Sequence, residues 1–84
     1  MNDWKQILVA PSDSIYRTLE VIDRSALQIA LVVDEKGRLL GTVTDGDVRR
    51  GILRGLGLDS TVAEIMNKNF SFSHVEDVRE KVLA

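Results

Sequence analysis

A buried strand, a tight turn and a second strand that lead directly into a helix constrain this chain more than any other feature. The run Ile29–Val33 is apolar without alternation, as expected for a strand that is covered on both faces. Residues 34–37 are turn formers, and Gly37 is free to adopt a positive φ. Residues 38–44 then return as the second arm of a hairpin, and residues 45–54 predict a helix. A hydroxyl and two carboxylates therefore stand where a strand meets a helix start.

The first part of the chain predicts another strand and another helix. Residues 7–10 are apolar and are followed by Pro11, which predicts a short strand. Ser12 or Ser14 would cap the next helix, because a serine hydroxyl accepts a hydrogen bond from a first-turn N–H. Four apolar side chains recur at helical spacing on one face of that helix: Ile15, Leu19, Ile22 and Ala26. The predicted fold class is α/β (α+β), a β-α-β-β-α unit with a small mixed sheet and two helices.

The helix over residues 45–54 is expected to pack through one side and to stop at a glycine. Three apolar side chains would form that side: Val48, Ile52 and Leu56. Gly55 suits the helix end, since glycine adopts the left-handed conformation found there. A capping box over residues 61–64 then predicts a short helix that runs through Met66.

The C-terminal residues repeat the opening pattern of strand and capped helix. Residues 70–72 predict a strand, and residues 73–76 form a second capping box. An apolar stripe follows it: Val75, Val78 and Val82. We therefore expect one complete unit with its N-terminal arm and linker in residues 1–66, and the beginning of a second unit in residues 67–84.

Composition narrows the class of protein and of partner. A chain of 84 residues is one small domain at most, and it is marginal alone because so short a chain buries only about 60% of its unfolded surface. The net charge of −2 provides no basic field for nucleic acid or an anionic membrane. No cysteine is present, which excludes disulfides and thiolate metal sites. The N-terminus does not read as a signal peptide, and no apolar run approaches the length of a membrane span, so we expect a soluble, cytoplasmic module.

The chain follows the order strand, helix, hairpin and helix, and it closes on the pattern Gly-hydrophobe-hydrophobe-Thr-x-x-Asp. This order and pattern resemble the CBS domain, a regulatory module named after cystathionine β-synthase. The matching letters are residues 31–34, 37–41 and 44–48, and residues 62–66 look like the linker to a following motif. The family often has proline where Leu31 stands and a hydrophobe where Thr42 stands. A looser likeness, in residues 1–10 and 47–55, is to CBS pairs in front of sugar-phosphate nucleotidyltransferase domains.

The resemblance implies a module that binds an adenosine-containing ligand and regulates an attached or partner enzyme. The ligand would be AMP, ADP, ATP or S-adenosylmethionine. By resemblance, Thr44 contacts phosphate and Asp47 the ribose. The residues themselves suit these roles, because helix N-termini attract anions and an ionised carboxylate accepts hydroxyl hydrogen bonds. The family's base slot would be formed here by Ile7, Gln28, Ile29 and Thr42.

CBS motifs work in pairs, and a site often joins the Thr and Asp of one motif to the base slot of its neighbour. The second motif is only begun in residues 67–84, so we expect a second copy of the chain to replace it in a homodimer. The apolar stripe after residue 74 supports this expectation, because a helix of about ten residues is marginal in water without a packing partner.

Two simpler interpretations remain open. Asp45 and Asp47 are common in a helix first turn for capping alone, so the chain could be a ligand-free dimerisation or structural module. Arg49 and Arg50 would either neutralise further phosphates or form a solvated face. His74 is the only histidine, and with no cysteine the sequence predicts neither a metal site nor a base for a serine nucleophile. We therefore expect no catalysis and no required cofactor.

Overall fold

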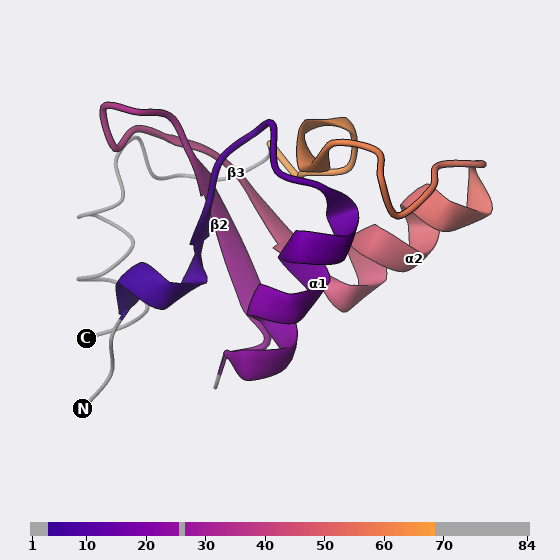
Figure 1. Ribbon diagram of the computed structural model, residues 1–84, viewed down its shortest axis with the longest axis horizontal. Helices are drawn as coiled ribbons and strands as arrows, with labels where there is room; N and C mark the ends of the chain where they lie inside the picture. Colours follow the sequence, from indigo (N-terminus) through magenta and orange to yellow (C-terminus); the bar gives the residue numbers. More distant parts are fainter. Residues whose placement is uncertain (1–3, 26, 69–84) are drawn as a thin grey trace.

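A computed structural model of the chain describes residues 4–25 and 27–68 (Figure 1). The elements in chain order are the 3-10 helix η1 (Trp4–Ile7), β1 (Leu8–Val9), α1 (Ile15–Arg24), β2 (Ile29–Val33), β3 (Leu39–Thr44), α2 (Asp45–Leu53) and the 3-10 helix η2 (Val62–Glu64). This order confirms the predicted α+β unit of three strands and two helices. The strand expected at residues 70–72, the capping box at 73–76 and the stripe behind it lie outside the described residues, as does Ala26.

The three strands form one mixed sheet in the order β1-β2-β3. β1 runs parallel to β2, with Leu8 opposite Leu31, and α1 provides the crossover that parallel strands require. β2 and β3 are antiparallel, with Ile29 opposite Thr44 at one end of the pair. β2 is therefore the central strand, and its successive residues Ala30, Leu31 and Val32 are all at most 1% exposed, so both of its faces are buried, as its unbroken apolar sequence predicts.

The core lies between the sheet and the two helices, which occupy one side of it in Figure 1. Several side chains from both layers are almost fully buried: Ile15, Val21, Ile22, Ala30, Leu31, Val32 and Val43. The predicted face of α1 is confirmed for Ile15 and Ile22, and Leu19 packs at its edge. Thr18 is buried among them, and its hydroxyl donates to the Ser14 carbonyl at 2.9 Å, so its polarity is satisfied.

The first strand is shorter than the sequence predicts. Only Leu8 and Val9 pair with β2. The Ala10 N–H donates to the Asp13 carboxylate at 2.9 Å instead, and Pro11 has no N–H, so the chain leaves the ladder at that point. Ile7 belongs to η1 rather than to the strand, but its side chain stays in the core at 7% exposure.

The buried side of α2 also differs from the prediction. Val48 is buried as expected, but Ile52 is 46% exposed. Gly51 is the buried residue of that turn, because Ile65 packs directly against its backbone. The helix ends at Leu53, and Gly55 follows with a φ of 103° in its expected role.

The helix predicted from residues 61–64 is a short 3-10 turn, η2, that stops before Met66. Thr61 is the N-cap residue of η2, but its side chain accepts no hydrogen bond from the backbone of the turn. The predicted capping box is therefore wrong. The Val62 N–H donates to the Asp13 carbonyl at 2.8 Å, and the Ala63 N–H donates to the Pro11 carbonyl at 3.2 Å. The segment before α1 thus supplies the acceptors that a side-chain cap would otherwise provide.

Candidate functional site

The candidate site begins where β3 runs into α2. Thr44 is the N-cap residue of α2 and has extended backbone angles, while the preceding Val43 is fully buried. The Asp47 carboxylate accepts two hydrogen bonds at one oxygen, Oδ2: from the Thr44 N–H at 2.9 Å and from the Thr44 hydroxyl at 3.1 Å. The N–H groups of Asp45 and Gly46 belong to the first turn, which has no acceptors within the helix. The strand end therefore presents a hydroxyl, a carboxylate and N–H groups together.

Arg50 completes this arrangement. Its Nη2 donates to Asp47 Oδ1 at 2.6 Å, across the i,i+3 spacing that brings two side chains together on a helix. The Asp47 side chain is only 12% exposed, whereas that of Arg50 is 66% exposed. From the sequence, Arg49 and Arg50 had the same two possible roles: neutralising further phosphates or forming a solvated face. In the structure, Arg50 pairs with Asp47, whereas Arg49 is an exposed surface residue.

Gln28 and Ile29 lie beside this helix start. Because Ile29 is opposite Thr44 in the β2–β3 register, the beginning of β2 and the end of β3 meet at the same end of the sheet. Gln28 has a φ of 58°, which is uncommon for a residue with a side chain. Its backbone N–H at 3.2 Å and its Nε2 at 2.9 Å both donate to the Ser25 carbonyl, which holds this tight connection between α1 and β2.

The two remaining predicted site residues lie further from Thr44. Thr42 shares a sheet face with Thr44, since alternate strand residues point the same way. Its backbone exchanges two hydrogen bonds with Asn67, at 3.0 and 2.8 Å, so it ties the chain behind η2 to the edge of β3. Ile7 precedes β1, and β2 stands between it and Thr44. The fold thus brings Gln28 and Ile29 to Thr44 and Asp47, and keeps Ile7 in the core.

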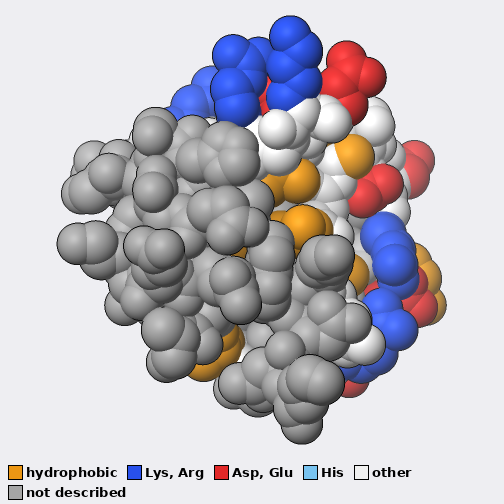
Figure 2. All heavy atoms as spheres, turned by 90° about the vertical axis from the view of Figure 1, so that its left-hand side faces the viewer, with side chains coloured by type: hydrophobic (Ala, Val, Ile, Leu, Met, Phe, Trp, Pro, Cys, Tyr) orange, Lys and Arg blue, Asp and Glu red, His pale blue; other side chains and the backbone are white. Residues whose placement is uncertain are grey.

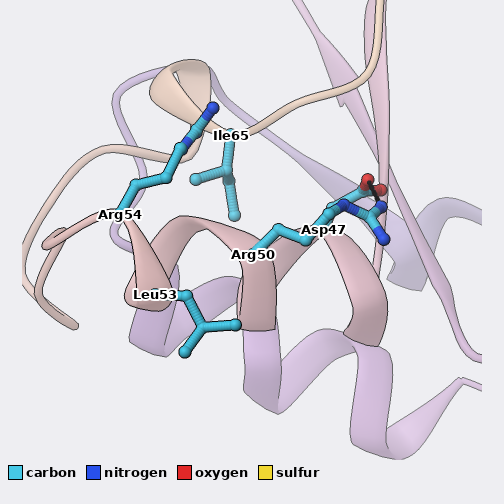
Figure 3. A pocket seen from close by; sticks show the side chains of 5 residues that line it. All are labelled: Asp47, Arg50, Leu53, Arg54 and Ile65. Atoms are coloured by element: carbon cyan, nitrogen blue, oxygen red, sulfur yellow. Dashed lines mark hydrogen bonds and ion pairs between the residues drawn. The ribbon is translucent and has the colours of Figure 1, made fainter.

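A shallow open pocket adjoins the site along α2. It encloses about 280 Å³ and is lined by Asp47, Arg50, Leu53, Arg54 and Ile65 (Figure 3). Arg54 donates from Nη2 to the Glu64 carbonyl at 3.3 Å. Neither Arg54 nor Ile65 is among the residues that the sequence predicts for the site. The i,i+4 spacing of Arg50 and Arg54 was the available signal for the first, but only the tertiary packing of η2 places Ile65.

The clearest electrostatic perturbation lies in the β2–β3 turn rather than at the site. The pKa of Asp34 is below its ordinary value of 3.8, mainly because the backbone N–H of Arg38 donates to its carboxylate. Partial desolvation opposes this, while the Arg38 guanidinium and the Lys36 N–H lower the pKa further. The Arg38 Nε lies 2.7 Å from Asp34 Oδ2. These bonds hold the turn in place, where Gly37 adopts a φ of 80°.

The surface of the described residues carries charges of both signs. Figure 2 shows lysine and arginine side chains beside aspartate and glutamate side chains at the rim of the visible face. In the part of the chain that the structure describes, no three histidine, aspartate or glutamate side chains gather as a metal site would need. No helix within the same residues has the length and apolar character to cross a membrane.

The chain belongs to the CBS domain family, whose pattern matches residues 4–54. An uncharacterized protein from Helicobacter pylori strain J99 is 42% identical over 55 residues, which cover 66% of this chain and 17% of that protein. Arabinose 5-phosphate isomerase KdsD from Pseudomonas aeruginosa is 35% identical over 72 residues, which cover 84% of this chain and 21% of the isomerase. The chain spans about a fifth of the length of these curated relatives.

Solved structures share the fold. A CBS domain protein from Streptococcus pneumoniae TIGR4 has a TM-score of 0.66 at 12% identity, covering 90% of this chain and 56% of that chain. CBSX2 in complex with AMP has a TM-score of 0.60 at 21% identity, covering 94% and 66%. The cytosolic domain of the Mg²⁺ channel MgtE in complex with ATP has a TM-score of 0.59 at 26% identity, covering 88% and 32%. These neighbours confirm the predicted CBS fold.

Proposed function

We propose that this chain is a regulatory module that binds an adenosine-containing nucleotide where β3 runs into α2. One observation carries the proposal: the strand register puts Ile29 opposite Thr44, whose N–H and hydroxyl are bonded to Asp47. An apolar side chain, a hydroxyl, a carboxylate and first-turn N–H groups therefore border one another. These are the groups that a base, a ribose and a phosphate need.

In the proposed complex, Thr44 and the first turn of α2 contact phosphate, and Asp47 accepts hydrogen bonds from ribose hydroxyls. The base would lie on Gln28, Ile29 and Thr42, and Ile7 would contribute only through the core, since β2 stands between it and Thr44. The MgtE cytosolic domain, which shares the fold at 26% identity and was solved with ATP, supports this ligand class. AMP, ADP and ATP are therefore the ligands to test first, with S-adenosylmethionine as the adenosine compound that lacks phosphate. The proposal includes the cytoplasmic location expected from the sequence.

The module would act without catalysis, by passing its occupancy to an enzyme. Because the chain spans about a fifth of its curated relatives, that enzyme would lie elsewhere in the protein or in a partner. The isomerase relative makes a sugar-phosphate isomerase one candidate, and the resemblance of residues 47–55 makes a sugar-phosphate nucleotidyltransferase another. In either case the ligand can shift the enzyme only by its difference in affinity for two arrangements of the module.

We also propose that two copies of the chain associate. Large apolar side chains on the described surface agree with this, with Leu53 80% and Tyr16 56% exposed. Sedimentation velocity at micromolar concentration should show a dimer, and a stable monomer there would contradict the proposal.

The binding proposal is tested by isothermal titration of the chain with AMP, ADP, ATP and S-adenosylmethionine. Asp47→Ala should abolish saturable binding, because it removes the ribose acceptor. Asp45→Ala is the matched control: it deletes a carboxylate from the same helix turn, but one that is exposed. Equal affinity in wild type and Asp47→Ala would refute the site assignment.

The ligand-free alternative rests on one observation of its own. Asp47 already accepts three hydrogen bonds, from Thr44 and Arg50, so capping alone accounts for its conformation. Thermal unfolding separates the two functions, since a ligand at a hundred times its Kd stabilises a protein by about 2.7 kcal/mol. A melting temperature that is indifferent to millimolar nucleotide would favour the structural module.

A further inference from the structure

The pocket beside the candidate site gives it an excess of positive charge. Two of its lining residues are arginines, Arg50 and Arg54, and one is a carboxylate, Asp47. Figure 3 shows Arg50 reaching along α2 toward Asp47, and Arg54 rising beside Ile65. A pocket in which cations outnumber anions favours an anionic ligand group over a neutral one.

Arg50 is held loosely enough to change its partner. Its side chain is 66% exposed, and the ion pair with Asp47 is a surface i,i+3 pair. Water competes for the exposed guanidinium, which weakens the pair, whereas the Asp47 side chain is 12% exposed and largely shielded. The guanidinium also lies over Gly46, where an added Cβ atom would be 3.3 Å from Arg50 Nη1. Glycine at this position leaves room for the arginine to move over the helix start.

The hydrogen bonds of Asp47 determine what a ligand must displace. Oδ2 already accepts from both the N–H and the hydroxyl of Thr44, whereas Oδ1 accepts from Arg50. A ribose hydroxyl that approaches Asp47 therefore competes with Arg50 for Oδ1. A phosphate on the same ligand offers the freed guanidinium two oxygens in the planar geometry that arginine prefers.

We propose that Arg50 is a specificity residue that sets the charge preference of the site: it releases Asp47 to the ribose and pairs with ligand phosphate. Arg54, one helical turn further along α2, extends the positive charge for longer phosphate chains. The chain then binds ATP more tightly than AMP, and AMP more tightly than adenosine or the cationic S-adenosylmethionine. This inference rests on the proposed nucleotide site and names its ligand class.

The test is a titration of wild type, Arg50→Gln and Arg49→Gln with adenosine, AMP and ATP at 0.15 M salt, which screens distant charges. Arg49 is the matched control, an exposed neighbour that does not line the pocket. Loss of a charge-assisted hydrogen bond should weaken ATP binding to Arg50→Gln about tenfold. Binding of adenosine to that variant should not weaken, and it should tighten by at most about fivefold, because no phosphate is present and Arg50 no longer competes with the ribose for Asp47 Oδ1. Arg49→Gln should change every affinity by less than about twofold.

Two results would overturn the inference while leaving the nucleotide site in place. One is wild-type binding of adenosine and ATP with equal affinity. The other is an equal loss for adenosine and ATP in Arg50→Gln, which would make Arg50 only a support for Asp47. Failure of the wild-type chain to bind any of the three ligands would refute the proposed function and this inference with it. Circular dichroism of each variant confirms that the fold is retained.

Discussion

Gly51 offers the sharpest test of how the linker packs on α2. A Cβ atom added at this buried position would run into the Ile65 side chain and lie 3.5 Å from Leu56 Cδ1. Ile65 is itself 6% exposed, so it has little room to yield. Overpacking of this kind costs about 1–3 kcal/mol, and the better helix propensity of alanine returns about 0.5–1 kcal/mol. Gly51→Ala should therefore lower the free energy of unfolding by about 1 kcal/mol at the middle of these ranges and by up to about 2.5 kcal/mol.

Gly46→Ala is the matched control, because it makes the same change in the same helix. The added Cβ would lie 3.3 Å from the end of the exposed Arg50 side chain and 3.7 Å from Thr44 Oγ1, so stability should stay constant or rise by up to about 1 kcal/mol. Urea unfolding followed by circular dichroism measures both. The penalty at Gly51 should shrink in an Ile65→Ala background, which removes the clashing methyl group. Equal stability of the two alanine variants would refute the packing described. So would a loss of stability in Gly51→Ala that is the same with and without the Ile65→Ala substitution.

Three further predictions concern the scaffold. Leu31→Ala, at a central position 1% exposed, should cost about 2–5 kcal/mol in urea unfolding. Leu58→Ala, at 46% exposure, should cost less than about 1 kcal/mol, and equal effects would contradict the burial. Ser14→Ala should cost about 1 kcal/mol, because the Ser14 hydroxyl accepts from the Arg17 N–H, and Ser12→Ala should leave the melting temperature unchanged. Because folding lowers the pKa of Asp34, its contribution to stability is complete above about pH 3.8 and is lost as pH falls through the lower folded value. Asp34→Asn should thus be less stable than wild type at pH 6 and lose that difference toward pH 2, and a gap that persists at pH 2 would oppose the assignment.

The predictable parts of the fold were those determined by hydrophobic pattern. The unbroken apolar run of β2 and the helical spacing of Ile15 and Ile22 each indicated their element, because burial follows directly from those patterns. Details that depend on distant segments escaped prediction. The Asp13 carboxylate accepts the Ala10 N–H, so β1 is shorter than predicted. Ile65 packs against Gly51, so Gly51 rather than Ile52 is the buried residue of that turn of α2.

The candidate site divides in the same way. Thr44 and Asp47 could be placed at a helix start from their spacing alone, since first-turn positions follow from the strand–helix boundary. The meeting of Ile29 with Thr44 required the hairpin register, which the turn at residues 34–37 sets. The ion pair between Arg50 and Asp47 could not be predicted from the sequence, because i,i+3 spacing permits an ion pair without requiring it. The side-chain conformation in the structure was needed to identify it.

The central claim is that a nucleotide binds where β2 begins and α2 starts, and amide NMR spectra during an ATP titration test it most directly. The account predicts that the largest shifts occur at Gln28, Ile29, Thr44 and Asp47, and that the distant turn over residues 34–38 is unaffected. Shifts that gather at that turn, or spectra that do not change with saturating ATP, would contradict it.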